Sequence, residues 1–525
     1  MGVAARPIHG VIATHDSFHG RYLVLAAEIE RRFPVAQWRC GDVDVWPLAR
    51  MDLYLDMYWQ QDGVVRPRPH AFPLRYGSRV LRPLINVWKS RRDPSHFALR
   101  PQPAHAIFLG DGVSLDRVDG AWTDRFGEPV MAALERRGLK TFLMQSGNLS
   151  RLPWRRRTFA ANVVGAKGWL KGLSSSTPVQ LPAHDEVVEY LAQRGVEAPS
   201  FEARALAQRA HIVSATASAF ERVLCAVEPK LAFVVTYYAQ LGHAFVLACR
   251  RQGILSIDLQ HDPQAGAHEA YSWDAVPECG YRTLPALFWN WSEEDSAVIR
   301  RWSDRLPQRW HQSVPGGHTQ LARFLDDDEP LTREQDARFR ARSGAPYERE
   351  ILVALQPIGG RRAIWEALAG EIDAAPPGWR WWIRRHPASH PGQDAEFGRL
   401  LSLKRANVMI EASSEFPLPT LLRHMSVVLS LCSGAAAESA MLGVPAIFLS
   451  EEARASLGHL IAGGQASIVP ACDIADAIAR LPALQGPHKM PVPLKLDETL
   501  ERLDAIASDY AALCRRVDHI GRGSS

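Results

Sequence analysis

Residues 427–449 read VVLSLCSGAAAESAMLGVPAIFL, and this stretch decides the fold. An apolar run at 427–431 predicts a buried strand, and a second run at 445–449 predicts another. Between them, Ser433 can cap a helix that runs to about Leu442, and Gly443 fits the position after a helix end, where a positive φ is favoured. A strand, a helix and a strand in this order predict a parallel βαβ unit.

The same alternation continues toward the N-terminal side of this unit. Apolar runs predict strands at 350–355, 379–383 and 408–410, and a helix is expected around 363–372 after the Gly359-Gly360 loop. A Pro417–Pro419 turn should open a further short helix. We therefore predict a Rossmann-like, doubly wound α/β domain over residues 326–495, with its strands in one parallel sheet.

The N-terminal half repeats the theme and predicts a second Rossmann-like domain over residues 1–325. Its expected helix spans 239–252, and its expected strands span 10–14, 106–109, 140–144, 231–236 and 255–259. Two domains also suit the length, because 525 residues exceed what one hydrophobic core can organise. The boundary should lie between Trp302 and Tyr347, in a stretch with glycines, prolines and an acidic run. Residues 496–525 carry a helical apolar stripe that predicts a C-terminal helix packing back across the domains.

Composition narrows the class of protein. The chain is 46% hydrophobic and 22% charged, which is typical of a globular protein, and its net charge of +4 is too small to indicate nucleic-acid binding. Its apolar runs fall short of the roughly 20 residues that span a bilayer, and the N-terminus lacks the apolar core of a secretory signal. Seven dispersed cysteines without a C-x-x-C pair indicate reduced thiols. We expect a cytoplasmic protein.

The predicted helix after Ser433 has the chemistry of an anion site. Backbone N–H groups and the helix dipole at its start favour a phosphate, and Gly434 allows close approach. Glu438 lies one helical turn further, where its carboxylate could reach ribose hydroxyls. The alternative is that Ser433 is only a helix cap and that the small residues only pack the helix on a sheet.

These residues carry a family resemblance, which is strongest over residues 230–480. Ser433-Gly434, Glu438 and the Leu442–Pro445 ending resemble the nucleotide-sugar-binding helix of GT-B glycosyltransferases. Arg384-Arg385-His386-Pro387 is similar to the basic His-Pro motif of capsule and O-antigen polysaccharide transferases. Leu259-Gln260-His261 looks like their Gln-His-Gly loop, with Asp262 in place of the glycine.

The resemblance implies a fold and a donor site. The fold would be GT-B, with the two Rossmann-like domains facing a cleft. Cationic side chains at the end of the strand at 379–383 would neutralise a departing phosphate, although a solvated basic turn explains the same residues. The donor-binding residues implied are Gln356, Arg384, Arg385, His386, Ser433, Gly434 and Glu438.

The first domain should supply the acceptor site and the general base. Gly110-Asp111-Gly112 follows a predicted strand, so Asp111 is one candidate base, and His261 is the other. An ordinary turn would explain the first segment, and a hydrogen-bonded histidine the second. The loop that contains His261 is expected to shape the acceptor site through Gln260, His268 and Tyr271. The order Asp111-Gly112, His386-Pro387, Ser433 is also similar to the motifs of transferases that use CMP-sialic acid or CMP-Kdo.

The expected activity is an inverting, metal-independent glycosyl transfer. The donor would be CMP-Kdo or CMP-sialic acid ahead of a UDP-sugar, and the acceptor a surface polysaccharide or lipid-linked glycan. No Asp-x-Asp motif ends a donor-domain strand and no histidines have metal-ligand spacing, so we expect no metal or other cofactor. Two alternatives stay open: a wall-polymer type phosphotransferase that uses a CDP-polyol, and an inactive GT-B scaffold that binds polysaccharide.

One segment suggests a membrane surface. Residues 66–92, within a basic insertion at about 60–100, hold eight basic residues and no acid, interleaved with apolar side chains such as Phe72 and Trp88. A lipid-linked acceptor on the inner membrane face would explain this pattern, and so would a solvated basic arm.

Overall fold

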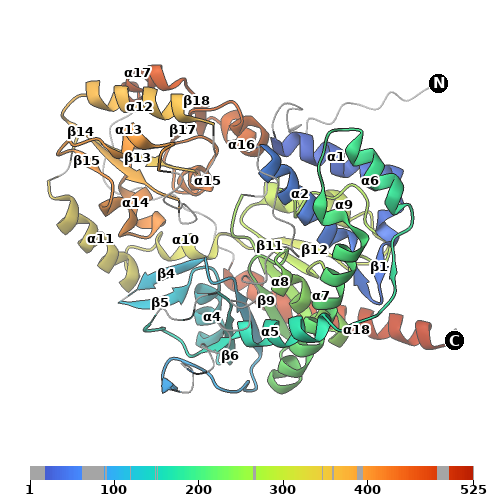
Figure 1. Ribbon diagram of the computed structural model, residues 1–525. Coiled ribbons are helices and arrows are strands. Elements are labelled where there is room, and N and C mark those ends of the chain that lie inside the picture. Colours follow the sequence, from blue (N-terminus) through green and yellow to red (C-terminus); the bar gives the residue numbers. More distant parts are fainter. Residues whose placement is uncertain are drawn as a thin grey trace, which may run out of the picture. The chain divides into compact units, whose positions relative to one another are not determined.

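The computed structural model describes residues 18–61, 88, 92–118, 120–147, 149, 152–263, 268–345, 347–356, 360–386, 394–481 and 496–523. The chain divides into two compact units (Figure 1). The N-terminal unit comprises Leu25–Asp262, Glu269–Arg323 and Pro493–Ser525. Of the described residues, the C-terminal unit comprises 18–24, 263, 268 and those from 324 to 481. The strand expected at residues 10–14 lies outside the described residues.

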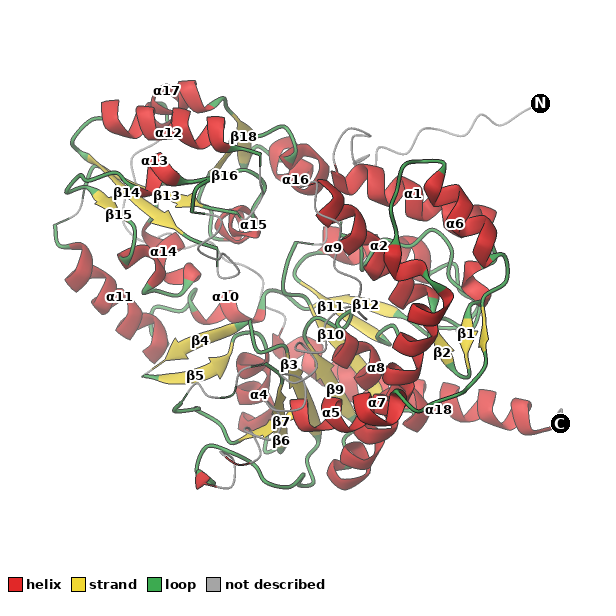
Figure 2. Ribbon diagram, in the orientation of Figure 1, coloured by secondary structure: helices red, strands yellow, loops and turns green. Residues whose placement is uncertain are grey.

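The N-terminal unit is built on a parallel sheet of seven strands (Figure 2). Its spatial order is β12-β11-β10-β9-β3-β6-β7. The first three strands of this sheet in chain order (β3, β6, β7) therefore extend to one edge, and the last four (β9 to β12) extend to the other. This is the doubly wound order of a Rossmann sheet, extended by one strand. The strands are β3 (Ala106–Gly110), β6 (Thr141–Gln145), β7 (Thr158–Ala160), β9 (Leu231–Val234), β10 (Leu255–Leu259), β11 (Leu287–Asn290) and β12 (Gln312–Pro315).

Helices and two small sheets complete the N-terminal unit, although residues 18–24 of its first helix are grouped with the C-terminal unit. The strands of the small sheets are β1 (Arg39–Cys40), β2 (Val43–Asp44) and β8 (Val179–Gln180) in one, and β4 (Leu115–Val118) and β5 (Ala121–Asp124) in the other. The helices are α1 (Phe18–Arg32), α2 (Trp46–Gln61), α4 (Gly127–Arg136), α5 (Ala161–Gly172), α6 (His184–Ala192), α7 (Ala203–Val227), α8 (Gln240–Gln252), α9 (Glu293–Ser303), α10 (Thr319–Arg323) and α18 (Leu496–Gly523). The C-terminal helix α18 returns to this unit, where it contacts β9, β10 and α4.

Helix α7 is a core helix of unusual length. Among the described residues it is the one helix long and apolar enough to cross a membrane, with a mean hydropathy of 1.2 over its most apolar window. However, 56% of that window is buried inside the protein, and α7 packs against α5 and α8. We therefore assign its apolar surface to the core of the N-terminal unit.

Helices α5 and α7 approach closely because glycines face the contact. A Cβ on Gly168 would lie 2.4 Å from Cα of Thr216, and a Cβ on Gly172 would lie 2.6 Å from Cα of Ile212.

We expect Gly168→Ala to destabilise the protein by about 2–3 kcal/mol, because the added methyl group meets backbone that cannot rotate away. Urea unfolding measures this. In the control Gly370→Ala, the methyl group would meet only the flexible end of Arg399 at 3.9 Å. That variant should be neutral or more stable by up to about 1 kcal/mol, and equal losses would contradict this account.

The C-terminal unit is a second parallel sheet, with six strands in the order β15-β14-β13-β16-β17-β18. This is the 3-2-1-4-5-6 order of a Rossmann sheet. The strands are β13 (Arg349–Ala354), β14 (Trp379–Arg384), β15 (Val408–Met409), β16 (Val427–Ser430), β17 (Ala446–Phe448) and β18 (Ala466–Ile468). The helices are α11 (Pro330–Ser343), α12 (Arg362–Ala374), α13 (Gly398–Leu401), α14 (Leu418–His424), α15 (Gly434–Met441), α16 (Ala453–Ala462) and α17 (Ile474–Ala479).

Both faces of this sheet are buried, as β17 illustrates. Ile447 joins a cluster with Trp379 and Trp381 of β14 and with α12, whereas Ala446 and Phe448 join a cluster on the other face with α15 and α16. A strand buried on both faces has a continuous apolar sequence. This is why the runs at 350–355, 379–383 and 427–431 identified β13, β14 and β16. The predicted fold class, α/β with two Rossmann-like parallel sheets, is confirmed.

Candidate functional site

Each sheet has a topological switch point, where helices leave two neighbouring strands in opposite directions. It lies between β13 and β16 in the C-terminal unit and between β3 and β9 in the N-terminal unit. Ligands of doubly wound sheets bind outside the carboxyl ends of the strands at this point. Candidate site residues are therefore those that follow β13, β16, β3 and β9.

At the C-terminal switch point, the chain builds a helix N-terminus against Gln356. Ser433 is the N-cap of α15, and its hydroxyl accepts from the Ala435 N–H at 3.2 Å. Gln356, which follows β13, accepts from the Cys432 N–H at 2.7 Å through Oε1 and lies 3.5 Å from Cys432 Sγ through Nε2. The structure thus brings Gln356 together with Ser433 and Gly434, which lie 77 and 78 positions further along the chain. The half-buried Glu438 follows one turn along α15.

The predicted basic residues follow β14, the neighbour of β13. Nη1 of Arg384 donates to the carbonyl groups of Ser413 and Phe416, the latter at 2.8 Å. Arg385 forms an ion pair with Asp394, and His386 is exposed. The ends of β14 and β16 flank β13, so they lie roughly 10 Å apart across the sheet edge. Both arginines therefore have structural partners at this edge, which the motif did not predict.

At the N-terminal switch point, Asp111 organises its own loop. Its Oδ1 accepts from the N–H groups of Val113 (2.8 Å) and Ser114 (2.7 Å). Its Oδ2 accepts from the hydroxyls of Ser114 (2.9 Å) and Thr236 (3.1 Å). A carboxylate offers about four lone-pair directions. The protein's own donors therefore occupy most of the accepting capacity of Asp111.

The glycines beside Asp111 are required by packing. A Cβ on Gly110 would lie 2.3 Å from Oδ2 of Asp124 and from Nε2 of Gln145, and a Cβ on Gly112 would lie 2.2 Å from the Ser146 carbonyl oxygen. Asp124 is buried beneath this loop and accepts from Gln145 Nε2 at 2.6 Å and from the Gly127 N–H at 2.7 Å. Burial raises the pKa of Asp124 to about 7. Sequence reasoning did not identify Asp124 or Gln145.

The end of β10 places His261 beside Tyr238. The Tyr238 hydroxyl lies 3.0 Å from Nε2 of His261, with ring centroids 5.8 Å apart, and Phe126 faces the imidazole edge-on at 6.4 Å. The preceding residue, Gln260, is buried. Its Oε1 accepts from the Trp291 N–H at 2.7 Å, and its Nε2 donates to the Asp262 carbonyl at 3.0 Å. Gln260 therefore fixes the backbone that carries His261.

The other predicted acceptor residues occupy different environments. Tyr271 is fully buried, and its hydroxyl donates to Oδ2 of Asp258 at 2.8 Å. Burial raises the pKa of Asp258 to about 7. His268 is half-buried and belongs to the short stretch grouped with the C-terminal unit. Tyr271 is thus a core residue, whereas His261 is half-buried at the sheet edge.

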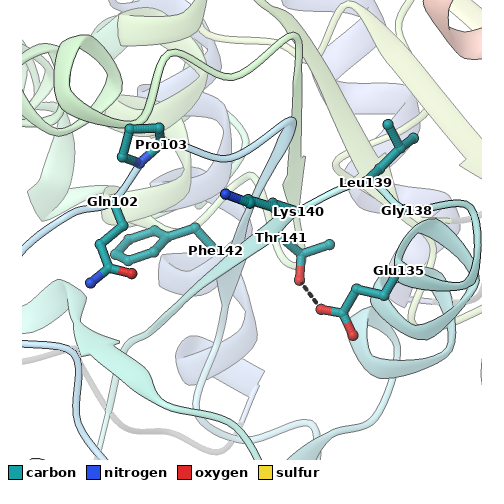
Figure 3. Close-up of a pocket in the computed structure, with 8 residues that line it drawn as sticks. All are labelled: Gln102, Pro103, Glu135, Gly138, Leu139, Lys140, Thr141 and Phe142. Carbon is teal, nitrogen blue, oxygen red and sulfur yellow. Dashed lines mark hydrogen bonds between the residues drawn. The ribbon is translucent and has the colours of Figure 1, made fainter.

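One pocket lies at the opposite edge of the N-terminal sheet (Figure 3). It has a volume of about 370 Å³ and is found before β3 and at the start of β6. The Thr141 hydroxyl donates to Glu135 at 2.5 Å within it. None of the predicted site residues lines it. The lining residues are Gln102, Pro103, Glu135, Gly138, Leu139, Lys140, Thr141 and Phe142.

Two further sequence predictions concern a metal and a membrane. Within the described ranges, no group of three or more His, Cys, Asp or Glu side chains could hold a metal ion. The basic segment at 66–92 lies outside those ranges except for Trp88 and Arg92. Trp88 is 52% exposed, and the Arg92 guanidinium lies 3.9 Å from the centre of its ring. The membrane contact stays a prediction.

Comparison with known proteins finds no matching family model and no matching curated protein. Similar solved structures include the UDP-GlcNAc 2-epimerase from Neisseria meningitidis bound to UDP-GlcNAc. It is 15% identical, with 77% of this chain and 93% of that chain covered and a TM-score of 0.43. The Methanocaldococcus jannaschii UDP-GlcNAc 2-epimerase in complex with UDP-GlcNAc and UDP is 13% identical, with 75% and 99% covered and a TM-score of 0.46. The glycosyltransferase SnogD from Streptomyces nogalater is 15% identical, with 80% and 100% covered and a TM-score of 0.38.

Proposed function

We propose that the protein is a glycosyltransferase that binds a nucleotide-sugar donor at the carboxyl edge of its C-terminal sheet. One observation carries the proposal: the N-terminus of α15 opens at the topological switch point, with Ser433, Gly434 and Gln356 side by side. Backbone N–H groups and the helix dipole at a helix N-terminus favour a phosphate. The amide of Gln356, the carboxylate of Glu438 and the exposed His386 supply further polar groups for the nucleotide.

The proposed reaction is a direct displacement with inversion. An acceptor hydroxyl oxygen attacks the anomeric carbon of the sugar, the bond to the nucleotide breaks, and the nucleotide leaves with the electron pair. The helix N-terminus stabilises the negative charge on the departing phosphate, and the chemistry needs no metal. We propose CMP-Kdo or CMP-sialic acid as the donor ahead of a UDP-sugar, and a polysaccharide or lipid-linked glycan as the acceptor.

The N-terminal unit supplies the general base, and we propose His261 rather than Asp111. A base needs a lone pair within reach of the acceptor hydroxyl. The Asp111 carboxylate already accepts four hydrogen bonds. His261 lies half-buried at the sheet edge with a tyrosine hydroxyl as its neighbour. Asp111 then shapes the loop beneath the acceptor site.

Nucleotide binding tests the donor site first. We expect one of CMP, CDP, UDP and GDP to raise the melting temperature, because a ligand at 100 times its Kd adds about 2.7 kcal/mol of stability. Gln356→Glu keeps the acceptor for the Cys432 N–H but places a negative charge beside the phosphate. It should weaken nucleotide binding at least tenfold without unfolding the protein. Calorimetric titration measures both effects.

The matched control is Gln102→Glu, which changes a residue of the pocket beside β3 and β6 in the N-terminal unit. It should leave nucleotide binding unchanged; if it weakens binding and Gln356→Glu does not, the nucleotide occupies that pocket and the proposal is wrong.

Product analysis then defines the reaction. A glycosidic link with free nucleotide supports the transferase, and a phosphodiester product indicates the polyol phosphotransferase. Conversion of donor without acceptor indicates an epimerase or a hydrolase. A protein that binds polysaccharide without turnover is a scaffold.

A further inference from the structure

The turn between β9 and α8 contains a strained residue at the N-terminal switch point. Thr236 has φ of +60°, in the left-handed region that a β-branched residue rarely adopts. Such a conformation is strained, and it persists where the surrounding structure enforces it, often at functional sites. The turn is also tightly packed, because a Cβ on Gly242 would lie 2.5 Å from the Tyr237 carbonyl oxygen.

This turn touches both candidate bases. The hydroxyl of Thr236 donates to Asp111, and the hydroxyl of Tyr238 lies 3.0 Å from Nε2 of His261. Tyr237, between them, turns the other way, and its hydroxyl donates to the Ala270 carbonyl in the core. The strained turn therefore places the side chains of Thr236 and Tyr238 at the sheet edge and the side chain of Tyr237 in the core.

The position of the imidazole decides how a proton can reach it. Nδ1 of His261 is buried, so it is not the nitrogen that an acceptor hydroxyl approaches from solvent. Nε2 is the other ring nitrogen, and the Tyr238 hydroxyl bonds to it. A phenol can donate one hydrogen bond and accept another. Tyr238 is half-buried at the same edge, as His261 is.

We infer that Tyr238 relays the acceptor proton to His261, an inference that rests on the proposed transferase function. As the acceptor oxygen bonds to the anomeric carbon, its proton passes to Oη of Tyr238, and the phenol proton passes to Nε2 of His261. The tyrosine is neutral before and after the step, and the imidazole becomes imidazolium. The nucleotide departs with the electrons of the broken bond, so charge and atoms balance.

A double-mutant cycle tests the relay. Tyr238→Phe keeps the ring and removes only the hydroxyl, and it should lower kcat at least 30-fold with the KM for donor nearly unchanged. If the two residues form one relay, the double variant Tyr238→Phe, His261→Ala should be no slower than His261→Ala alone. Near-normal turnover of Tyr238→Phe, or multiplicative losses in the double variant, would overturn the inference.

Tyr237→Phe is the matched control, because it removes a hydroxyl from the same turn. It should lower the melting temperature through the lost hydrogen bond to Ala270 and leave kcat within about threefold. A loss of turnover equal to that of Tyr238→Phe would show that the turn merely needs to be intact, and the relay would be wrong.

Histidine 15N NMR separates this inference from the proposed function. The His261 signals are those lost in His261→Ala, and they report the tautomer directly. In Tyr238→Phe they should shift, because the partner of Nε2 is gone. Unchanged signals would overturn the relay even in an active enzyme. If the wild-type protein binds no nucleotide and transfers no sugar, the proposed function fails, and a shift of these signals then reports only the hydrogen bond.

Discussion

Replacing His261 with alanine is expected to lower kcat at least 100-fold while donor binding stays nearly unchanged. General-base catalysis contributes on that scale, and His261 lies in the N-terminal unit, whereas the proposed donor site lies in the C-terminal unit. The imidazole packs beside Phe126 and Tyr238, so its loss should leave the fold intact. Steady-state kinetics and nucleotide titration measure the two effects separately. A parallel loss of nucleotide affinity would assign His261 to donor binding.

Asp111→Asn should behave differently, and the contrast decides between the two candidate bases. One oxygen becomes an NH2 group that faces N–H and hydroxyl donors, so we expect a loss of about 1–3 kcal/mol in the free energy of unfolding. Turnover should fall less than tenfold at a temperature where the variant is folded. If Asp111→Asn instead abolishes turnover with an unchanged melting temperature, Asp111 is the base and His261 is a structural histidine.

The C-terminal unit could be predicted in detail because its strands are buried on both faces. Continuous apolar runs identified β13, β14, β16 and β17, and the observed bounds differ from the predicted ones by at most one residue. The helix cap at Ser433 and the positive φ of Gly443 (+76°) are also as predicted. In the seven-stranded sheet of the N-terminal unit, β7, β11 and β12 were missed, because each is short and includes a polar residue. Such strands are held by their neighbours in the sheet.

The candidate site was predictable only where local sequence determines it. Ser433 and Gly434 follow from strand-then-helix patterning, and Asp111 from two glycines. The contact between Tyr238 and His261 joins residues 23 positions apart on separate strand ends, and no spacing rule indicates it. Likewise, a basic motif does not show that Arg384 bonds to the carbonyl groups of Ser413 and Phe416. Partners across a sheet edge depend on strand order, which the sequence of a single strand does not contain.

Strand order also buries two carboxyl groups, and these should make stability depend on pH. Burial raises the pKa of Asp124 and of Asp258 to about 7, from 3.8. The folded state then holds protons that the unfolded chain releases between pH 4 and pH 7. Through these groups, the free energy of unfolding should fall as the pH rises across that window and level off above pH 7.

Asp258→Asn tests this directly, because asparagine resembles the neutral carboxyl group and its oxygen can still accept from Tyr271. Relative to wild type, the variant should gain up to about 4 kcal/mol between pH 4 and pH 8, since a shift of one pKa unit corresponds to about 1.4 kcal/mol. Urea unfolding at several pH values measures the difference. The exposed Asp509→Asn is the control and should show no pH-dependent gain. If the two variants follow the same pH curve, Asp258 is ionised in the folded protein, and its bond to Tyr271 stabilises the charge more than burial opposes it.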